Sequence, residues 1–484
     1  MTAWIVAGFM VAGFLVLIRV LKLVEGGREV IGLARRVVGV VRSDQSDEAK
    51  ESELQTTTKR LLLLFLLLTL GGGIALLAPA GVLWVFDWFG WIEQDPVYEV
   101  MVSPLFIAVT SVLAIGFLFV PRRSVPKSDY SLVERCLHHV AFQSKTAQIA
   151  LADVEDRVYA KSIAECSAGR PAFITGLPRA GTTLLLECCN RLPEFATHCY
   201  RDMPFVLTPC FWNRFSAVFR RGGQKKERAH GDGMLIDFDS PEALEEVIWS
   251  AFWKRKYQTD RIAPWSDEDD EEFTDFFRSH IRKIISLRAK DPSTARYISK
   301  NNLNISRIST LRRVFPDAIV IVPFREPVFH AASLLEQHLN FLRIHAEDPF
   351  ARKYMRAIGH YDFGANLRPV DFDGWFDNRR SQDATTLSFW LEYWIAAYRH
   401  LLAQDAEMFF LDYAALCADP TATLRRLGNC IGSNDETALI EAGADIRSPR
   451  AREVDTSPVD ESVLRDAEGV YRALCDQTSS SPRS

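Results

Sequence analysis

A glycine-containing loop directly after an apolar, strand-like run is the feature of this sequence that most restricts its fold. Residues 171–175 read PAFIT, and residues 176–183 read GLPRAGTT. Gly176 and Gly181 have the spacing of the phosphate-binding loop G-x-x-x-x-G-K-[ST], which joins a buried strand to a helix. A threonine follows Gly181 where that motif has lysine, and Arg179 lies inside the loop instead. The segment therefore predicts a strand–loop–helix unit that binds an anion with the help of an arginine.

Anion binding at this loop would use the backbone N–H groups at the start of the following helix, because these groups have no partner within the helix. An arginine adds charge-assisted hydrogen bonds worth on the order of 1.5–3 kcal/mol each. The residues expected at the anion are Pro178, Arg179, Ala180, Gly181, Thr182 and Thr183. A tight strand-to-helix turn without a ligand is the structural alternative.

A second segment, VPFREPVFHAAS at 322–333, has a related arrangement. Arg325 follows the apolar run 317–324, and Ser333 lies eight residues further on. Pro327 favours a helix start at its position, which places Ser333 on that helix. Together with the glycine-containing loop, Arg325 and Ser333 predict a site for a nucleotide with two separate anionic groups.

Short apolar runs alternate with helical patterns from about residue 128 onward. The runs at 171–176, 317–324 and 408–413 are strand-like, and helical sequence follows the first two. Buried strands that alternate with helices indicate a parallel sheet, whose ligands bind at the carboxyl ends of the strands. We therefore predict an α/β fold over residues 126–474, with a P-loop-like parallel sheet flanked by helices.

The stretch DFDSPEALEEVIW at 237–249 predicts a helix, with Ser240 as its N-cap and Pro241 in its first turn. We assign this helix a structural role. The aromatic and basic run WSAFWKRKYQ that begins at Trp249 fits either an acceptor pocket or a membrane surface, but it is also typical of an ordinary amphipathic helix.

Three apolar stretches precede the α/β part, at about residues 3–24, 61–86 and 100–120. Each has close to the roughly 20 mostly apolar residues that cross a bilayer. A cleaved signal peptide is the alternative for the first stretch. We therefore predict a membrane anchor with three transmembrane helices over residues 1–125, and a disordered tail at 475–484.

Basic residues near the ends of these stretches predict the orientation of the anchor. Seven lysines and arginines lie between the first two stretches and three follow the third, whereas the loop between the second and third has four acidic residues and no basic one. The N-terminus is thus expected outside. The α/β part is expected in the cytoplasm, at the inner (cytoplasmic) membrane.

Composition restricts the other classes of function. A net charge of −5 and an isoelectric point near 6.1 argue against a nucleic-acid-binding protein, which usually has a basic excess. The nine cysteines include no C-x-x-C pair and no cysteine–histidine spacing typical of zinc sites. They indicate reduced thiols, and we predict no metal site.

The motifs together resemble those of the sulfotransferase superfamily, in its bacterial and tyrosylprotein-type members. GLPRAGTT is followed downstream by FREPxxxxxxS. The run from YISK to FREP at 297–327, and FLDYAALCADPTATLRRL at 410–427, are also similar to segments of that family. The resemblance covers roughly residues 170–432.

This resemblance implies a donor, 3′-phosphoadenosine-5′-phosphosulfate (PAPS), and no metal. The first motif would hold the 5′-phosphosulfate and the second the 3′-phosphate. Arg179 would neutralise the leaving phosphate, and Lys300 would stabilise the sulfonate. Asp202 is the first candidate for the base that takes the acceptor proton, and His198 and His230 are the alternatives.

The sequence thus predicts a membrane-anchored sulfotransferase that transfers sulfonate from PAPS to a hydroxyl of a carbohydrate, lipid or lipid-linked acceptor. A cytoplasmic catalytic part favours a bacterial cell. Two alternatives stay open. One is a P-loop kinase or NTPase, although its loop lysine is missing here. The other is a non-catalytic membrane scaffold that retains the fold.

Overall fold

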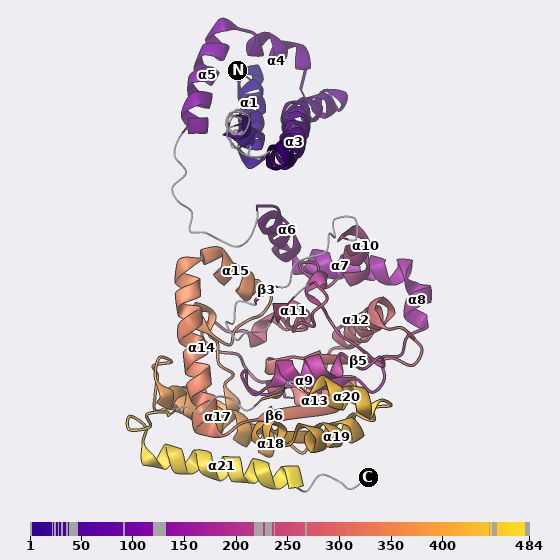
Figure 1. The fold of residues 1–484 in the computed structure, drawn as a ribbon, viewed down its shortest axis with the longest axis vertical. Coiled ribbons are helices and arrows are strands. Elements are labelled where there is room, and N and C mark those ends of the chain that lie inside the picture. The colour runs from indigo at the N-terminus through magenta and orange to yellow at the C-terminus, as the bar shows by residue number, and fades with distance from the viewer. Residues whose placement is uncertain are drawn as a thin grey trace. The chain divides into compact units, whose positions relative to one another are not determined.

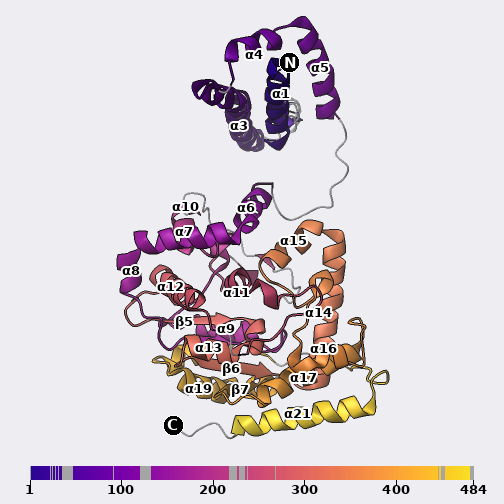
Figure 2. The same ribbon diagram turned by 180° about the vertical axis from the view of Figure 1, so that it is seen from behind.

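The computed structural model describes residues 2–479 with gaps. The gaps are scattered positions between 22 and 46 and residues 91, 120–131, 217–225, 228–234, 237, 267–268, 445 and 448–452. The chain divides into two compact units, Met1–Val125 and Pro126–Ser484. Both units are drawn in Figure 1 and, from behind, in Figure 2.

The first unit is helical. Its longer described helices are α1 (Thr2–Val20), α3 (Asp47–Trp88), α4 (Gln94–Met101) and α5 (Pro104–Phe119). A small buried cluster joins all four of them, through Ala7, Leu83, Val97 and Phe106.

Among the described residues, one helix is long and apolar enough to cross a membrane. It is the 29-residue segment Arg60–Trp88 of α3, which coincides with the second predicted span. The first predicted span contains a shorter apolar helix, Val6–Ile18, and α5, in the third, has 16 residues. Both are shorter than the roughly 20 residues that a span needs. The three-helix anchor therefore stays a prediction.

The second unit is built around a parallel sheet, as the alternation of strands and helices predicted. Its strands lie in the order β2-β5-β1-β6-β7. In the centre, Ile174 pairs with Lys300 on one side and with Ile321 on the other. The bounds are β1 Ala172–Ile174, β2 Phe195–Ala196, β5 Arg296–Lys300, β6 Ile319–Phe324 and β7 Phe409–Asp412. The runs expected at 171–176, 317–324 and 408–413 are thus β1, β6 and β7, whereas β2 and β5 were not predicted.

Alternate residues of the strands enter two different cores, because successive side chains of a strand point to opposite faces. Phe173 and Val322 enter one core, which contains residues of α12 (Glu271–Arg288), α14 (Pro327–Glu347), α17 (Leu387–Leu402) and α21 (Glu461–Ser479). Ile174 and Ile321 enter the other, with residues of α9 (Thr182–Cys189), α18 (Tyr413–Ala418), α19 (Pro420–Ile431) and α20 (Glu436–Ala442). Helices therefore cover both faces of the sheet (Figures 1 and 2).

Shorter elements complete this unit. Its other helices are α6 (Leu132–Gln143), α7 (Lys145–Val158), α8 (Ala160–Ala164), α10 (Pro209–Ser216), α11 (Glu246–Phe252), α13 (Ile308–Val314), α15 (Pro349–Ala357) and α16 (Trp375–Asn378). A separate two-stranded sheet pairs β3 (Lys226–Glu227) with β4 (Leu235–Ile236).

Two expectations about helix bounds differ from the structure. The helix expected from Ser240 begins at Glu246, because the preceding residues pair with another segment: Pro241 forms a bridge with Cys199, and the Glu242 N–H donates to the His198 carbonyl at 2.9 Å. At the C-terminus α21 continues to Ser479, so residues 475–479, which were expected in a disordered tail, are helical.

A buried ion pair joins two helices of this unit. Lys283 on α12 is 1% exposed, and its Nζ lies 3.1 Å from the fully buried Glu155 carboxylate of α7 and 2.8 Å from Asp156. Burial raises the pKa of Glu155, and the charge of Lys283 opposes that rise. Glu155 therefore depends on Lys283 for its only close cation among the described residues.

Replacing this lysine is expected to destabilise the second unit. Lys283→Met leaves Glu155 buried without its cation, at a cost of about 3–5 kcal/mol, which corresponds to a Tm lowered by roughly 10 °C. The measurement is tryptophan fluorescence during heating of the purified full-length protein. Lys290→Met, at an exposed position just beyond the same helix, is the control. Equal Tm values for the two variants would contradict a stabilising role for the pair.

Candidate active site

The loop between β1 and α9 has a backbone that leaves the first N–H groups of α9 uncapped. Its φ angles are +140° at Gly176, +72° at Arg179 and +95° at Gly181. A Cβ at Gly181 would lie 2.8 Å from the Tyr413 ring, so this position requires glycine. Gly181 is the N-cap residue of α9 and makes no side-chain capping bond. Such a helix start favours an anion.

The buried side chain of His330 fixes the backbone of this loop. The indole N–H of Trp394 donates to Nδ1 of His330 at 3.1 Å, and Nε2 of His330 lies 2.8 Å from the Pro178 carbonyl oxygen. Because an indole nitrogen only donates, Nδ1 accepts and Nε2 carries the hydrogen. Burial lowers the pKa of His330 to about 3, so the ring is neutral at physiological pH. Residues of α14 and α17 thus fix the loop backbone.

The two arginines that the motifs predicted lie next to each other. Arg325 donates from a terminal guanidinium nitrogen to the Arg179 carbonyl oxygen at 3.0 Å, and its guanidinium lies 4.9 Å above the Tyr413 ring. Arg179 donates from Nε to the Ser333 hydroxyl at 3.3 Å. Burial lowers the pKa of Arg325, and the nearby charge of Arg179 adds to this effect. Because arginine stays protonated, two like charges lie close together here, an arrangement that an anion would stabilise.

These side chains surround a cavity of about 390 Å³, which is within the usual range for small-molecule sites. Two predicted residues lie at its margin instead. Ala180 is fully buried, and Ser333 contacts Arg179 without lining the cavity. The predicted residues that line it are Pro178, Arg179, Gly181, Thr182, Thr183, Lys300 and Arg325.

Asn302 connects the loop with the opposite wall of the cavity. The Thr182 hydroxyl donates to its side-chain oxygen at 3.4 Å, and its amide nitrogen donates to the Asp362 carboxylate at 3.4 Å. The Thr175 hydroxyl donates to the Asn302 backbone carbonyl at 3.3 Å. The segment that follows Lys300 is therefore joined to the loop on one side and to residue 362 on the other.

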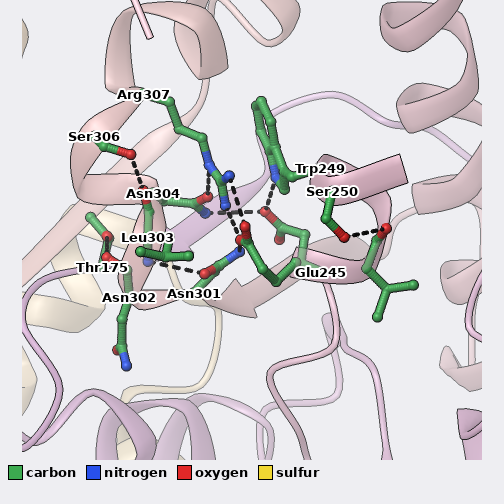
Figure 3. A network of polar contacts seen from close by, with 12 residues as sticks. Thr175, Glu245, Trp249, Ser250, Asn301, Asn302, Leu303, Asn304, Ser306 and Arg307 are labelled. Carbon is green, nitrogen blue, oxygen red and sulfur yellow. Dashed lines mark hydrogen bonds and ion pairs between the residues drawn. The ribbon is translucent and has the colours of Figure 1, made fainter. Parts of the chain in front are cut away.

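A buried polar network around Asn301 and Arg307 packs against this segment (Figure 3). Glu246 accepts hydrogen bonds from Arg307 at 2.5 Å and from Asn301 at 2.8 Å. Arg307 is fully buried, and its guanidinium lies 3.9 Å above the Trp249 ring. Burial alone would lower the pKa of Arg307, but the charge of Glu246 holds it above its ordinary value. The adjacent, fully buried Glu245 accepts hydrogen bonds from neutral donors, namely Trp249, Tyr297, Ser299 and Asn304.

Asp202 does not lie in the cavity. Its side chain is 1% exposed, accepts a hydrogen bond from the Cys199 N–H at 3.0 Å and forms an ion pair with Arg288. Burial alone would raise the pKa of Asp202, but the hydrogen bond from His198 and the charge of Arg288 hold it below its ordinary value. This position favours the structural role of an ion-paired carboxylate. His198 is in the same buried cluster, and His230 lies outside the described residues.

The cavity also contains three acidic side chains and one histidine that sequence reasoning missed. They are Glu242, Glu246, His360 and Asp362. The two glutamates lie in the segment to which we had assigned a structural helix. The other two follow α15 in the run GHYDFG, where a histidine and an aspartate between two glycines were the only available signal.

Comparison with known proteins supports one family. Residues 171–365 match the model of the sulfotransferase family. Over these residues the match confirms the resemblance to the sulfotransferase family that the motifs predicted, and it supports sulfate transfer in general. No curated protein matches the sequence significantly.

Several solved sulfotransferase structures are similar to parts of the chain. STF9 from Mycobacterium avium is 14% identical, with a TM-score of 0.43, over 73% of this chain and 88% of its own. STF1 from Mycobacterium tuberculosis H37Rv is 13% identical, with a TM-score of 0.38, over 74% and 90%. The sulfotransferase domain of the Synechococcus PCC 7002 olefin synthase is 13% identical, with a TM-score of 0.29, over 64% and 96%.

The stability of the protein is expected to fall as the pH is lowered from 6.5 towards 4. His330 has a pKa of about 3 in the fold and an ordinary value of 6.5, so the unfolded chain binds more protons between these values. One such group changes the free energy of unfolding by about 1.4 kcal/mol per pH unit within that window. His330→Asn should therefore give a shallower dependence of Tm on pH.

The control for this measurement is His139→Asn, because His139 is exposed. Buried His138, His338 and His345, whose pKa values burial lowers to about 4, contribute to the same window and keep part of the slope in both variants. If His330→Asn keeps the full slope of the unmodified protein, His330 is not the neutral buried group described above.

Proposed function

We propose that this protein is a membrane-anchored sulfotransferase that uses PAPS as its donor and a hydroxyl group as its acceptor. One observation carries the proposal: Arg179 and Arg325 meet at the uncapped start of α9, beside a cavity that Lys300 also lines. The family match over residues 171–365 supports sulfate transfer in general.

The donor has two anionic ends, and the site has two sets of groups that suit them. The N–H groups at the start of α9 and the guanidinium of Arg179 would hold the 5′-phosphosulfate. Arg325 would hold the 3′-phosphate, and Ser333, which now accepts a hydrogen bond from Arg179, would turn towards the same phosphate when the donor binds. The rigid support of the loop by His330 suits this task, because a pre-organised backbone binds without a further ordering cost.

Sulfuryl transfer depends on positioning and on charge stabilisation. The acceptor oxygen forms a bond with sulfur, while the bond from sulfur to the bridging phosphate oxygen breaks in line with it. Arg179 would neutralise the charge that develops on the leaving phosphate. Lys300, at the end of β5, would stabilise the sulfonate oxygens.

His360 is our candidate for the base that takes the acceptor proton. It lines the cavity, and burial lowers its pKa, which keeps the imidazole neutral and able to accept a proton at pH 7. The charges of Asp362 and Glu242 favour its protonated form, and the charge of Lys300 opposes it. These four groups are thus near enough to influence one another, as proton transfer beside the sulfonate requires.

The proposed location combines two arguments. Segment Arg60–Trp88 supports a membrane span, and the distribution of lysine and arginine around the apolar stretches favours a cytoplasmic second unit, which suits a bacterial cell. An anchored enzyme at the inner membrane can reach a carbohydrate, lipid or lipid-linked acceptor.

Donor binding is tested by calorimetry with adenosine 3′,5′-bisphosphate, the product that carries both phosphates. We expect the full-length protein to bind it. Arg179→Ala and Arg325→Ala should each weaken binding by about 10- to 150-fold, which corresponds to the loss of 1.5–3 kcal/mol of charge-assisted bonding. Arg191→Ala, at an exposed position just after α9, is the matched control and should bind normally. Absence of binding by the folded, unmodified protein would refute the proposal.

The choice of base is tested by comparing His360→Gln with Asp202→Asn. His360→Gln should lower kcat by roughly 10²–10⁴-fold and leave the affinity for adenosine 3′,5′-bisphosphate unchanged, because it removes proton transfer alone. Asp202→Asn should lower the Tm, because it breaks the ion pair with Arg288. A large loss of kcat in Asp202→Asn at unchanged Tm would reverse the assignment.

A further inference from the structure

The cavity has two chemically different ends. The donor end contains Arg179, Arg325 and the start of α9. The other end is formed by α15 with the loop after it and by the segments around residues 203 and 244. Apolar and aromatic side chains line this end, namely Met203, Leu244, Tyr354, Met355, Ile358 and Phe363, together with the polar groups Glu242, Glu246, His360 and Asp362.

Two of the polar groups at this second end already have partners within the protein. Glu246 accepts hydrogen bonds from Arg307 and Asn301, and Asp362 accepts one from Asn302. A sugar acceptor needs several directional partners for its hydroxyl groups, because each one that is buried without a partner costs free energy. Besides Glu242 and His360, the described walls at this end are lined mainly by apolar and aromatic side chains.

The charges near His360 act against an anionic acceptor. Glu242 and Asp362 both line the cavity, and both influence the titration of His360. A carboxylate or sulfate on the acceptor would meet like charge here, and like charges brought together at a desolvated site disfavour binding. The second end of the cavity therefore suits an uncharged molecule.

We propose that the acceptor is an uncharged alcohol on an apolar carbon skeleton, which packs against Met203, Tyr354 and Ile358 with its hydroxyl beside His360. This proposal rests on the proposed function and narrows its acceptor class. The acceptor oxygen bonds to the sulfur of PAPS, the bond from that sulfur to the bridging phosphate oxygen breaks, and the hydroxyl proton passes to the imidazole of His360. The products are a sulfate monoester and adenosine 3′,5′-bisphosphate, so no further reactant is needed.

The test measures transfer of radiolabelled sulfonate from PAPS by the full-length protein in nanodiscs, with three acceptor probes. The first two, 4-butylphenol and 4-(4-hydroxyphenyl)butanoate, are similar in size and differ in a terminal carboxylate. The third is maltose. We expect kcat/KM for 4-butylphenol to exceed that for each of the other two by at least about tenfold.

Two variants examine the two parts of the argument. Ile358→Asn should raise KM for 4-butylphenol by roughly tenfold and leave the affinity for adenosine 3′,5′-bisphosphate unchanged, since it alters the apolar wall alone. Leu339→Asn, on the exposed surface of α14, is its control. Glu242→Gln should raise kcat/KM for the carboxylated probe relative to 4-butylphenol by several-fold, because it removes one like charge.

The outcomes separate this proposal from the proposed function. If adenosine 3′,5′-bisphosphate binds, but maltose or the carboxylated probe is the better acceptor, or 4-butylphenol is not sulfated, the apolar acceptor is refuted and donor binding stands. The same holds if Ile358→Asn and Leu339→Asn behave alike. If adenosine 3′,5′-bisphosphate does not bind, the proposed function is refuted, and so is the proposed acceptor class, which depends on it.

Discussion

The buried ion pair between Glu246 and Arg307 is the constraint on which the geometry of the site depends. It joins the first residue of α11 to the residue that precedes α13, and it also holds Asn301 directly after β5. A buried charge pair of this kind is tolerated only when both partners keep good geometry, since either one alone would be an uncompensated charge. The pair therefore fixes the path of the chain at Lys300 and Asn302. Because the Thr182 hydroxyl donates a hydrogen bond to Asn302, the pair also influences the position of Thr182 at the start of α9.

The fold could be predicted where the local pattern and the tertiary structure agree. The runs that became β1, β6 and β7 are continuous and apolar, as strands buried on both faces are. β5 was missed because its sequence, RYISK, mixes charged and apolar residues, and β2 has only two residues. The false helix start at Ser240 has a different cause. The residues at 240–242 suit a helix start by their local sequence. In the fold, however, their backbone pairs with the segment around His198 instead of starting a helix.

The residues of the candidate site also fall into two groups, those that the sequence could predict and those that it could not. Arg179, Thr182, Thr183 and Arg325 belong to two motifs with fixed spacing, so their convergence at strand ends followed from the parallel sheet. Glu242, His360 and Asp362 come from loops that no sequence spacing relates, and only the folded chain brings them to one cavity. Asp202, the first candidate for the base, is a different case. Its sequence position resembles that of a base, but burial beside Arg288 places it in a structural ion pair.

The close approach of Tyr413 to Gly181 has an evolutionary consequence. One face of that ring fills the space that a side chain at 181 would need, and the same ring supports the guanidinium of Arg325. Position 181 thus cannot gain volume unless the ring moves, and the ring cannot move without disturbing the arginine. We therefore expect substitutions at these three positions to be coupled. Across homologous sequences, the glycine, the aromatic residue and the arginine are expected to be retained together or replaced together, although they lie far apart along the chain.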